Sequence, residues 1–186
     1  MIKHRRRPKV NPLLNLLGSK KLRIIIAFAL LLFLVFFYKK AFIYVLFLGV
    51  TALIIYYTKL YHVPIDISPL FFLEIVITRY YGLQYTLIFI LFGYIIPKTF
   101  AGTNMKFDSY VFIAISMFAN IFVLVFSGMP LIMVGFITSI IQYIVGVLFS
   151  MTMKPAALAM LDGVANVANN LVWFLVFSDI ITLLMR

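Results

Sequence analysis

The segment that decides the fold is LIMVGFITSIIQYIVGVLFSMTM, residues 131–153, which contains no charged side chain. A run of roughly 20 apolar residues is what an α-helix needs to cross the hydrocarbon core of a bilayer. The rest of the chain has the same character, since 65% of all residues are hydrophobic and 11% are charged. Soluble domains are typically about 45–50% apolar and about 25% charged. The sequence therefore predicts a polytopic membrane protein.

Similar runs on both sides of this segment predict an all-α membrane bundle of six to seven transmembrane helices. The runs are separated by lysine, proline and glycine, which mark helix ends. The expected helices cover residues 24–38, 41–57, 70–81, 83–96, 109–126, 131–153 and 156–185.

Proline and polar residues predict where three of these helices begin or end. Ser68 and Pro69 are expected as the N-cap and first residue of a short helix, because proline lacks the N–H that a first turn leaves unpaired. Pro97 is expected to end the next helix, and Asp108 to cap the one after it.

Three parts follow from this division. Residues 1–23 are expected to form a basic cytoplasmic tail, residues 24–57 a short transmembrane hairpin, and residues 67–186 a helical membrane bundle. Lys39 and Lys40 would lie at the tip of the hairpin with their ammonium groups in water. One long tilted helix in place of the hairpin is the alternative.

The tail carries eight of the sixteen Lys and Arg residues and no acid. Such a segment is attracted to anionic lipid headgroups by about 1 kcal/mol per basic residue. Nucleic acid is a weaker candidate partner, because no aromatic side chain interleaves the charges to stack on bases. The excess of Lys and Arg places the N-terminus in the cytoplasm by the positive-inside rule, in a multi-pass protein of the cell membrane.

Polar and small residues form one face on each of the last three predicted helices, since each residue turns an α-helix by about 100°. In chain order these faces are Ser109, Ser116, Asn120 and Ser127; Gly135, Ser139, Gln142, Gly146 and Ser150; and Asp162, Asn166, Asn169 and Asn170. Small residues allow membrane helices to approach closely, which favours helix packing for Gly135, Ser139, Gly146 and Ser150. A contact between helices that excludes water offers too few hydrogen-bond partners for this many carboxylate and carboxamide groups. The pattern therefore favours a solute cavity lined by Asn120, Gln142, Asp162, Asn166, Asn169 and Asn170.

Two further charges lie within predicted membrane helices. Glu74 needs an interior partner or a proton, whereas Arg79 is expected to extend to an interface. Motifs of ATPases, serine hydrolases and zinc proteases are absent from the sequence, as is cysteine. The two histidines, His4 and His62, have no cluster of carboxylates near them in the sequence, so neither a metal site, a cofactor nor an enzyme is expected.

Residues 67–102, ISPLFFLEIVITRYYGLQYTLIFILFGYIIPKTFAG, combine a short helix opened by Pro69, a turn at Gly82 and a helix with an internal Gly93. In this order of parts the chain from residue 67 onward resembles the MreD rod-shape proteins and the related substrate-binding S components of energy-coupling-factor transporters. The last helix, GVANVANNLVWFLVF at residues 163–177, is similar to the final helix of that group. The chain departs from MreD-like sequences in having Pro97 and Lys98 where they often carry an acid.

The resemblance implies two functions. An S component binds a small solute and delivers it with partner proteins. An MreD-like protein is a non-catalytic scaffold for cell-shape or envelope machinery. Either one implies a membrane or cytoplasmic protein partner.

Overall fold

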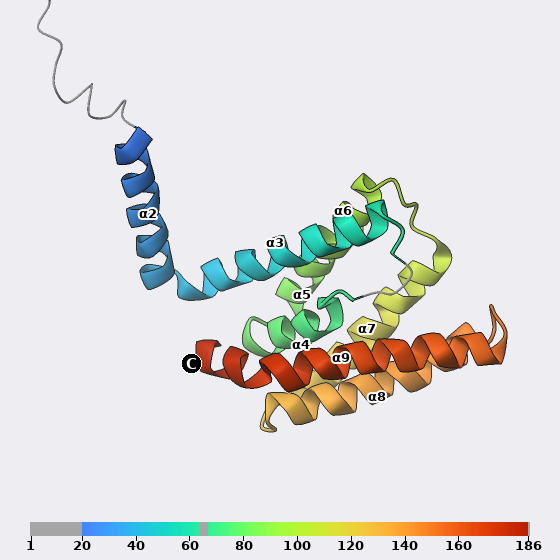
Figure 1. Ribbon diagram of the computed structural model, residues 1–186. Helices are drawn as coiled ribbons and strands as arrows, with labels where there is room; N and C mark the ends of the chain where they lie inside the picture. The colour runs from blue at the N-terminus through green and yellow to red at the C-terminus, as the bar shows by residue number, and fades with distance from the viewer. Residues whose placement is uncertain (1–19, 64–66, 186) are drawn as a thin grey trace, which may run out of the picture. The chain divides into compact units, whose positions relative to one another are not determined.

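The computed structural model describes residues 20–63 and 67–185, and within these ranges it contains helices and no strand (Figure 1). Five of these helices are long and apolar enough to cross a membrane. They are Lys39–Leu60, Leu83–Phe100, Phe107–Val125, Leu131–Ser150 and Ala156–Met185. The predicted fold class is confirmed, and the helices are those of an integral membrane protein.

The chain divides between Ile43 and Tyr44 into two compact units. The first contains α2, Lys20–Phe37, and the first residues of α3, Lys39–Leu60, with a break in the helix at Tyr38. The prediction that these two helices form a hairpin stays a prediction. Most of the predicted basic tail, residues 1–19, lies outside the described residues.

The second unit is the bundle, and a short helix lies at its centre. This is α4, Leu70–Tyr80, which packs against α5, Leu83–Ile90, and against the three helices that follow: α7, Phe107–Val125; α8, Leu131–Ser150; and α9, Ala156–Met185. Residues 71–78 of α4 are all buried, so no face of this stretch meets lipid. At 1.5 Å per residue α4 is about 16 Å long, roughly half the thickness of a bilayer core.

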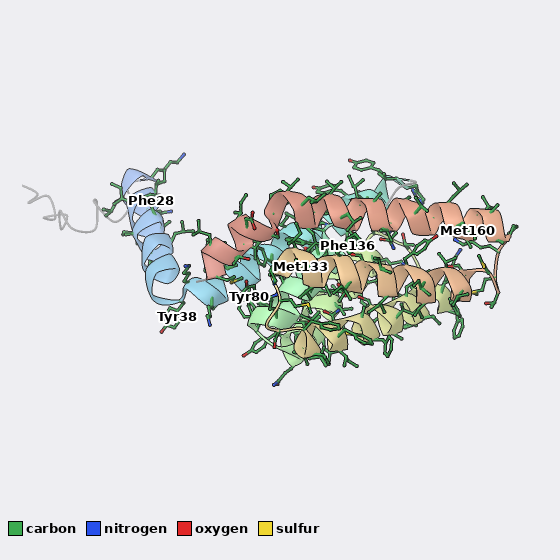
Figure 2. All side chains as sticks on the ribbon, turned by 90° about the horizontal axis from the view of Figure 1, so that it is seen from below. Phe28, Tyr38, Tyr80, Met133, Phe136 and Met160 are labelled. Atoms are coloured by element: carbon green, nitrogen blue, oxygen red, sulfur yellow. The ribbon has the colours of Figure 1, made fainter. Side chains whose placement is uncertain are left out.

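The longer helices surround α4. Figure 1 shows α8 and α9 side by side along much of their length, in agreement with their extensive contacts, and α7 packs against α8. Glycine allows the close approach of α8 and α9, because a Cβ on Gly135 would lie 2.2 Å from Phe174 Cδ1 and one on Gly163 would lie 2.4 Å from Val147 Cγ2. Large apolar side chains cover the outer faces, and Figure 2 labels the half-exposed Met133, Phe136 and Met160.

Hydrogen bonds show how deep α4 lies. At its C-terminal end the Arg79 guanidinium donates to the Ser127 carbonyl at 3.2 Å, and the Tyr81 hydroxyl donates to Met185 Sδ at 3.8 Å. We call this the Met185 end of the bundle. At the start of α4 the Ser68 carbonyl accepts a 3.2 Å bond from Asn169, which lies near the middle of α9. Therefore α4 begins at mid-depth and runs to the Met185 end.

Pro97 does not end a helix, and that prediction is wrong. The helix continues from α5 through a π-helical turn, η1, Leu91–Ile95, into α6, Ile96–Phe100. A proline within an α-helix removes one hydrogen bond and its ring collides with the carbonyl four residues earlier. The wider π-turn, in which the Ile96 N–H bonds to the Leu91 carbonyl, relieves that collision.

The predicted N-caps of two helices are each displaced by one or two residues. Pro69 is the N-cap of α4 rather than its first residue, and Ser68 is therefore not the cap. Asp108 lies inside the first turn of α7, whose N-cap is Lys106. Neither N-cap residue forms a side-chain hydrogen bond with its helix. The polar residues Ser68 and Asp108 were therefore not sufficient to locate the N-caps. Within the first turn the carboxylate of Asp108 still lies near the positive end of the helix dipole.

Candidate solute cavity

A cavity of about 340 Å³ lies between α4, α7, α8 and α9. It reaches from the α8–α9 turn at Lys154, which we call the Lys154 end of the bundle, to Glu74 and Asn170 at mid-depth. Its wall combines apolar side chains with a group of charged and carboxamide side chains. The charged and carboxamide residues that line it are Glu74, Asp108, Lys154 and Asp162, with Gln142, Asn166, Asn169 and Asn170.

Carboxamide groups form the inner wall. Asn170 is 2% exposed, and its Nδ2 donates to Gln142 Oε1 at 3.1 Å, which joins α9 to α8. Asn169 joins α9 to the start of α4 through the Ser68 carbonyl. Asn166 also lines the cavity, but its side chain forms no hydrogen bond with the described residues. Its carboxamide is therefore available to a solute.

Glu74 closes the cavity at the α4 side. Its carboxyl group is buried and accepts hydrogen bonds from Ser116 Oγ and, at 3.2 Å, from Asn120 Nδ2. The predicted need for an interior partner is met by these two α7 side chains, which are both neutral. Asn120 itself does not line the cavity. It lies behind Glu74, where its Oδ1 accepts a 2.6 Å bond from Thr78.

A charged group of residues lies toward the Lys154 end. Lys154 forms an ion pair with Asp162, and both side chains are partly exposed. Exposed pairs of this kind contribute little stability because water screens them. Ser109 of α7 also lines the cavity and accepts a 2.7 Å bond from Lys98, which is buried in α6, whereas the sequence predicted that the helix would end before it at Pro97.

The cavity gathers negative charge in a positively charged protein. The whole chain has five acidic residues and a net charge of +11. Three of those acids, Glu74, Asp108 and Asp162, line this one cavity, whereas Lys154 is its single basic lining residue among the described part of the chain. Lys98 lies beside the same wall through its bond to Ser109, so carboxyl groups outnumber basic groups there by a small excess.

The structure brings together five of the six residues that the sequence predicted for a solute cavity, namely Gln142, Asp162, Asn166, Asn169 and Asn170. Of the predicted packing residues, Gly146 and Ser150 line the cavity, Ser139 is fully buried, and Gly135 lies against Phe174. The sequence reasoning missed Asp108 and Ser68, and it did not join Glu74 to the cavity. The serine face on α7 was the available signal, because Ser116 binds Glu74.

Comparison of the chain with protein-family models, with curated proteins and with solved structures finds no match. The resemblance of the chain from residue 67 onward to MreD proteins and S components therefore stays a prediction from the sequence.

Proposed function

We propose that this integral membrane protein binds a small, positively charged solute in the cavity between α4, α7, α8 and α9, as a non-enzymatic, S-component-like subunit that acts in transport with partner proteins. The observation that carries the proposal is the gathering of three of the five carboxyl groups and four carboxamides on one cavity.

The cavity wall offers two kinds of group that can recognise an amine, carboxyl groups and carboxamides. Carboxylates attract a cation most strongly where little water screens the charge, and carboxamides can donate to or accept from the remaining polar groups of the solute. Because Asp162 already pairs with Lys154, Glu74 and Asp108 are the carboxyl groups available to the solute. Small-molecule sites typically measure about 300–1,000 Å³, so a cavity of about 340 Å³ suits a small ligand.

Orientation is part of the proposal. A cytoplasmic N-terminus and a spanning α2 would place the Lys154 end on the cytoplasmic side of the cell membrane. The solute would then enter the cavity from the cytoplasm in this conformation, past Asp108 and Asp162.

Native mass spectrometry of the gently solubilised full chain tests the proposal first, because it detects retained solutes and co-purifying proteins together. Thermal unfolding in detergent then compares putrescine, spermidine and choline with the anion succinate. We expect at least one amine, and not succinate, to raise the melting temperature.

A matched pair of variants assigns the effect to the cavity. Asn166→Leu removes an exposed carboxamide from the cavity wall, and Val164→Leu changes an exposed residue of the same helix that does not line it. The amine effect should persist in Val164→Leu and disappear in Asn166→Leu. If the amine effect persists in both variants, or if the parent protein responds to no amine, the cation site is contradicted. Lipids and a stoichiometric protein chain without any solute would instead favour the MreD-like scaffold.

A further inference from the structure

A second pocket, of about 320 Å³, lies at the Met185 end of the bundle, away from the solute cavity. It is formed by the last turn of α4, the turn that leads into α8, and the C-terminal part of α9. Its polar side chains are Arg79, Ser178, Asp179 and Thr182. None of these residues lines the solute cavity, so the pocket needs an explanation of its own.

Two buried hydrogen-bond donors of this pocket have no partner among the described residues. Ser178 is 2% exposed, and its Oγ forms no hydrogen bond there. Arg79 uses one guanidinium nitrogen, Nη2, to bind the Ser127 carbonyl, while its other terminal nitrogen, Nη1, is buried and unpartnered. Buried polar groups in native proteins are nearly always satisfied. Both residues line the same pocket, so one ligand that accepts hydrogen bonds and settles between them can satisfy both donors.

The start of α8 supplies a third feature that favours an anion. This helix of 20 residues begins after Pro130 and has no side-chain cap. The first turn of an α-helix leaves backbone N–H groups unpaired, and the helix dipole places positive partial charge at that end. Pro130, Leu131 and Ile132 all line the pocket. A phosphate group suits a guanidinium, a hydroxyl and a helix N-terminus together.

Asp179 limits the chemical class of ligand that this pocket can bind. This exposed carboxylate lines the pocket beside the anion-binding groups, and it would repel a ligand that carried only negative charge. Phosphoethanolamine joins a phosphate to an ammonium group. Its negative charge suits the anion-binding groups of the pocket, and its positive charge suits the carboxylate. The pocket also lies at an end of the membrane bundle, where lipid headgroups are found.

We propose that this pocket binds a phosphoethanolamine group, with its phosphate at Arg79, Ser178 and the α8 N-terminus and its ammonium at Asp179. The chemistry is shared by the phosphatidylethanolamine headgroup and by free phosphoethanolamine. The site is independent of the solute cavity and of the function proposed for it.

Native mass spectrometry of the delipidated full chain, titrated with phosphatidylethanolamine or phosphatidylglycerol, tests the proposal. Because the basic tail attracts phosphatidylglycerol in the parent and the variants alike, the test is the ratio of the two affinities. We expect Asp179→Asn to lower the affinity for phosphatidylethanolamine relative to phosphatidylglycerol at least tenfold, and Arg79→Gln to weaken the binding of phosphatidylethanolamine. Lys106→Gln, which changes an exposed basic residue outside both the tail and the pocket, is the matched control and should bind as the parent does.

Ser178→Ala keeps the test decisive where Arg79→Gln fails to fold. Its hydroxyl has no partner in the described protein, so the variant should melt no lower than the parent without lipid and yet bind phosphatidylethanolamine more weakly. A thermal shift with free phosphoethanolamine, but no lipid adduct, would support the same site with a soluble ligand. An unchanged ratio of the two lipid affinities in Asp179→Asn, or unchanged binding by Ser178→Ala, would overturn the proposal.

Discussion

Replacing Gly135 by alanine tests the closest helix contact in the bundle. An added Cβ would lie 2.2, 2.4 and 2.5 Å from the Cδ1, Cε1 and Cγ atoms of Phe174. Because three ring atoms are involved, the whole ring must move. That movement is opposed by Phe72, whose ring meets Phe174 edge to face at a centroid distance of 5.0 Å.

The expected cost follows from two opposing effects. Overpacking a buried contact typically destabilises a protein by about 1–3 kcal/mol. Alanine in place of glycine within a helix gains up to about 1 kcal/mol. We therefore expect Gly135→Ala to lower the free energy of unfolding by up to about 2 kcal/mol, as the net of these two values, and to be about 1–3 kcal/mol less stable than a Gly→Ala change in a helix that meets no neighbouring atom.

Gly49→Ala is the matched control, because Gly49 lies within α3 and an added Cβ there would meet no atom within 4 Å. Thermal and denaturant unfolding in the same detergent compare the two variants with the parent protein. Gly49→Ala should be as stable as the parent or more stable. A second change, Phe174→Leu, should recover part of the loss in Gly135→Ala, because it removes the ring that the new methyl group contacts. If Gly135→Ala were as stable as Gly49→Ala, the packing described for α8 and α9 would be refuted.

Three further predictions address the buried polar groups and the orientation of the chain. Glu74→Leu should destabilise the protein by about 1–3 kcal/mol, because it removes the acceptor of Ser116 and Asn120; Glu74→Gln, which retains an acceptor oxygen, should melt close to the parent, and equal melting of both variants would contradict this account. Asn170→Leu should lower the melting temperature more than Asn166→Leu, because Asn170 is buried and bonded to Gln142 whereas Asn166 is exposed; the reverse order in unfolding experiments would count against the described cavity wall. The chain has no native cysteine, so single cysteines at the exposed positions Lys106 and Gly128 can be labelled without background. An impermeant thiol reagent should reach position 106 from the cytoplasm and position 128 from the opposite side of the membrane. Labelling of both positions from one side would refute the proposed topology.

The parts of the fold that depend on local pattern were predictable from the sequence. Apolar length and the helical period placed α8 and α9, and the same period placed Asn166, Asn169 and Asn170 on one face. These residues line the cavity because a helix face is fixed by rotation along one helix.

The remaining features depend on contacts between helices that are distant in sequence. Nothing local shows that Asn120 lies behind Glu74 while Gln142 lies at the cavity, because that difference depends on the depth at which α4 begins. Pro97 was misassigned for a related reason, since a π-turn before it removes the collision on which the prediction relied. The depth of Lys98 likewise follows from its bond to Ser109 on α7.

The central position of α4 has a consequence for biogenesis. A helix of about 16 Å that contains Glu74 and Arg79 is not stable in a bilayer on its own. It is too short to span the hydrocarbon core, and its ends would leave backbone groups without hydrogen bonds in lipid. Ser116 and Asn120, the partners of Glu74, and Ser127, the partner of Arg79, are all synthesised after α4. During translation α4 must therefore wait at the membrane surface or in the insertion machinery until α7 is made, and only then can it move to the centre of the bundle.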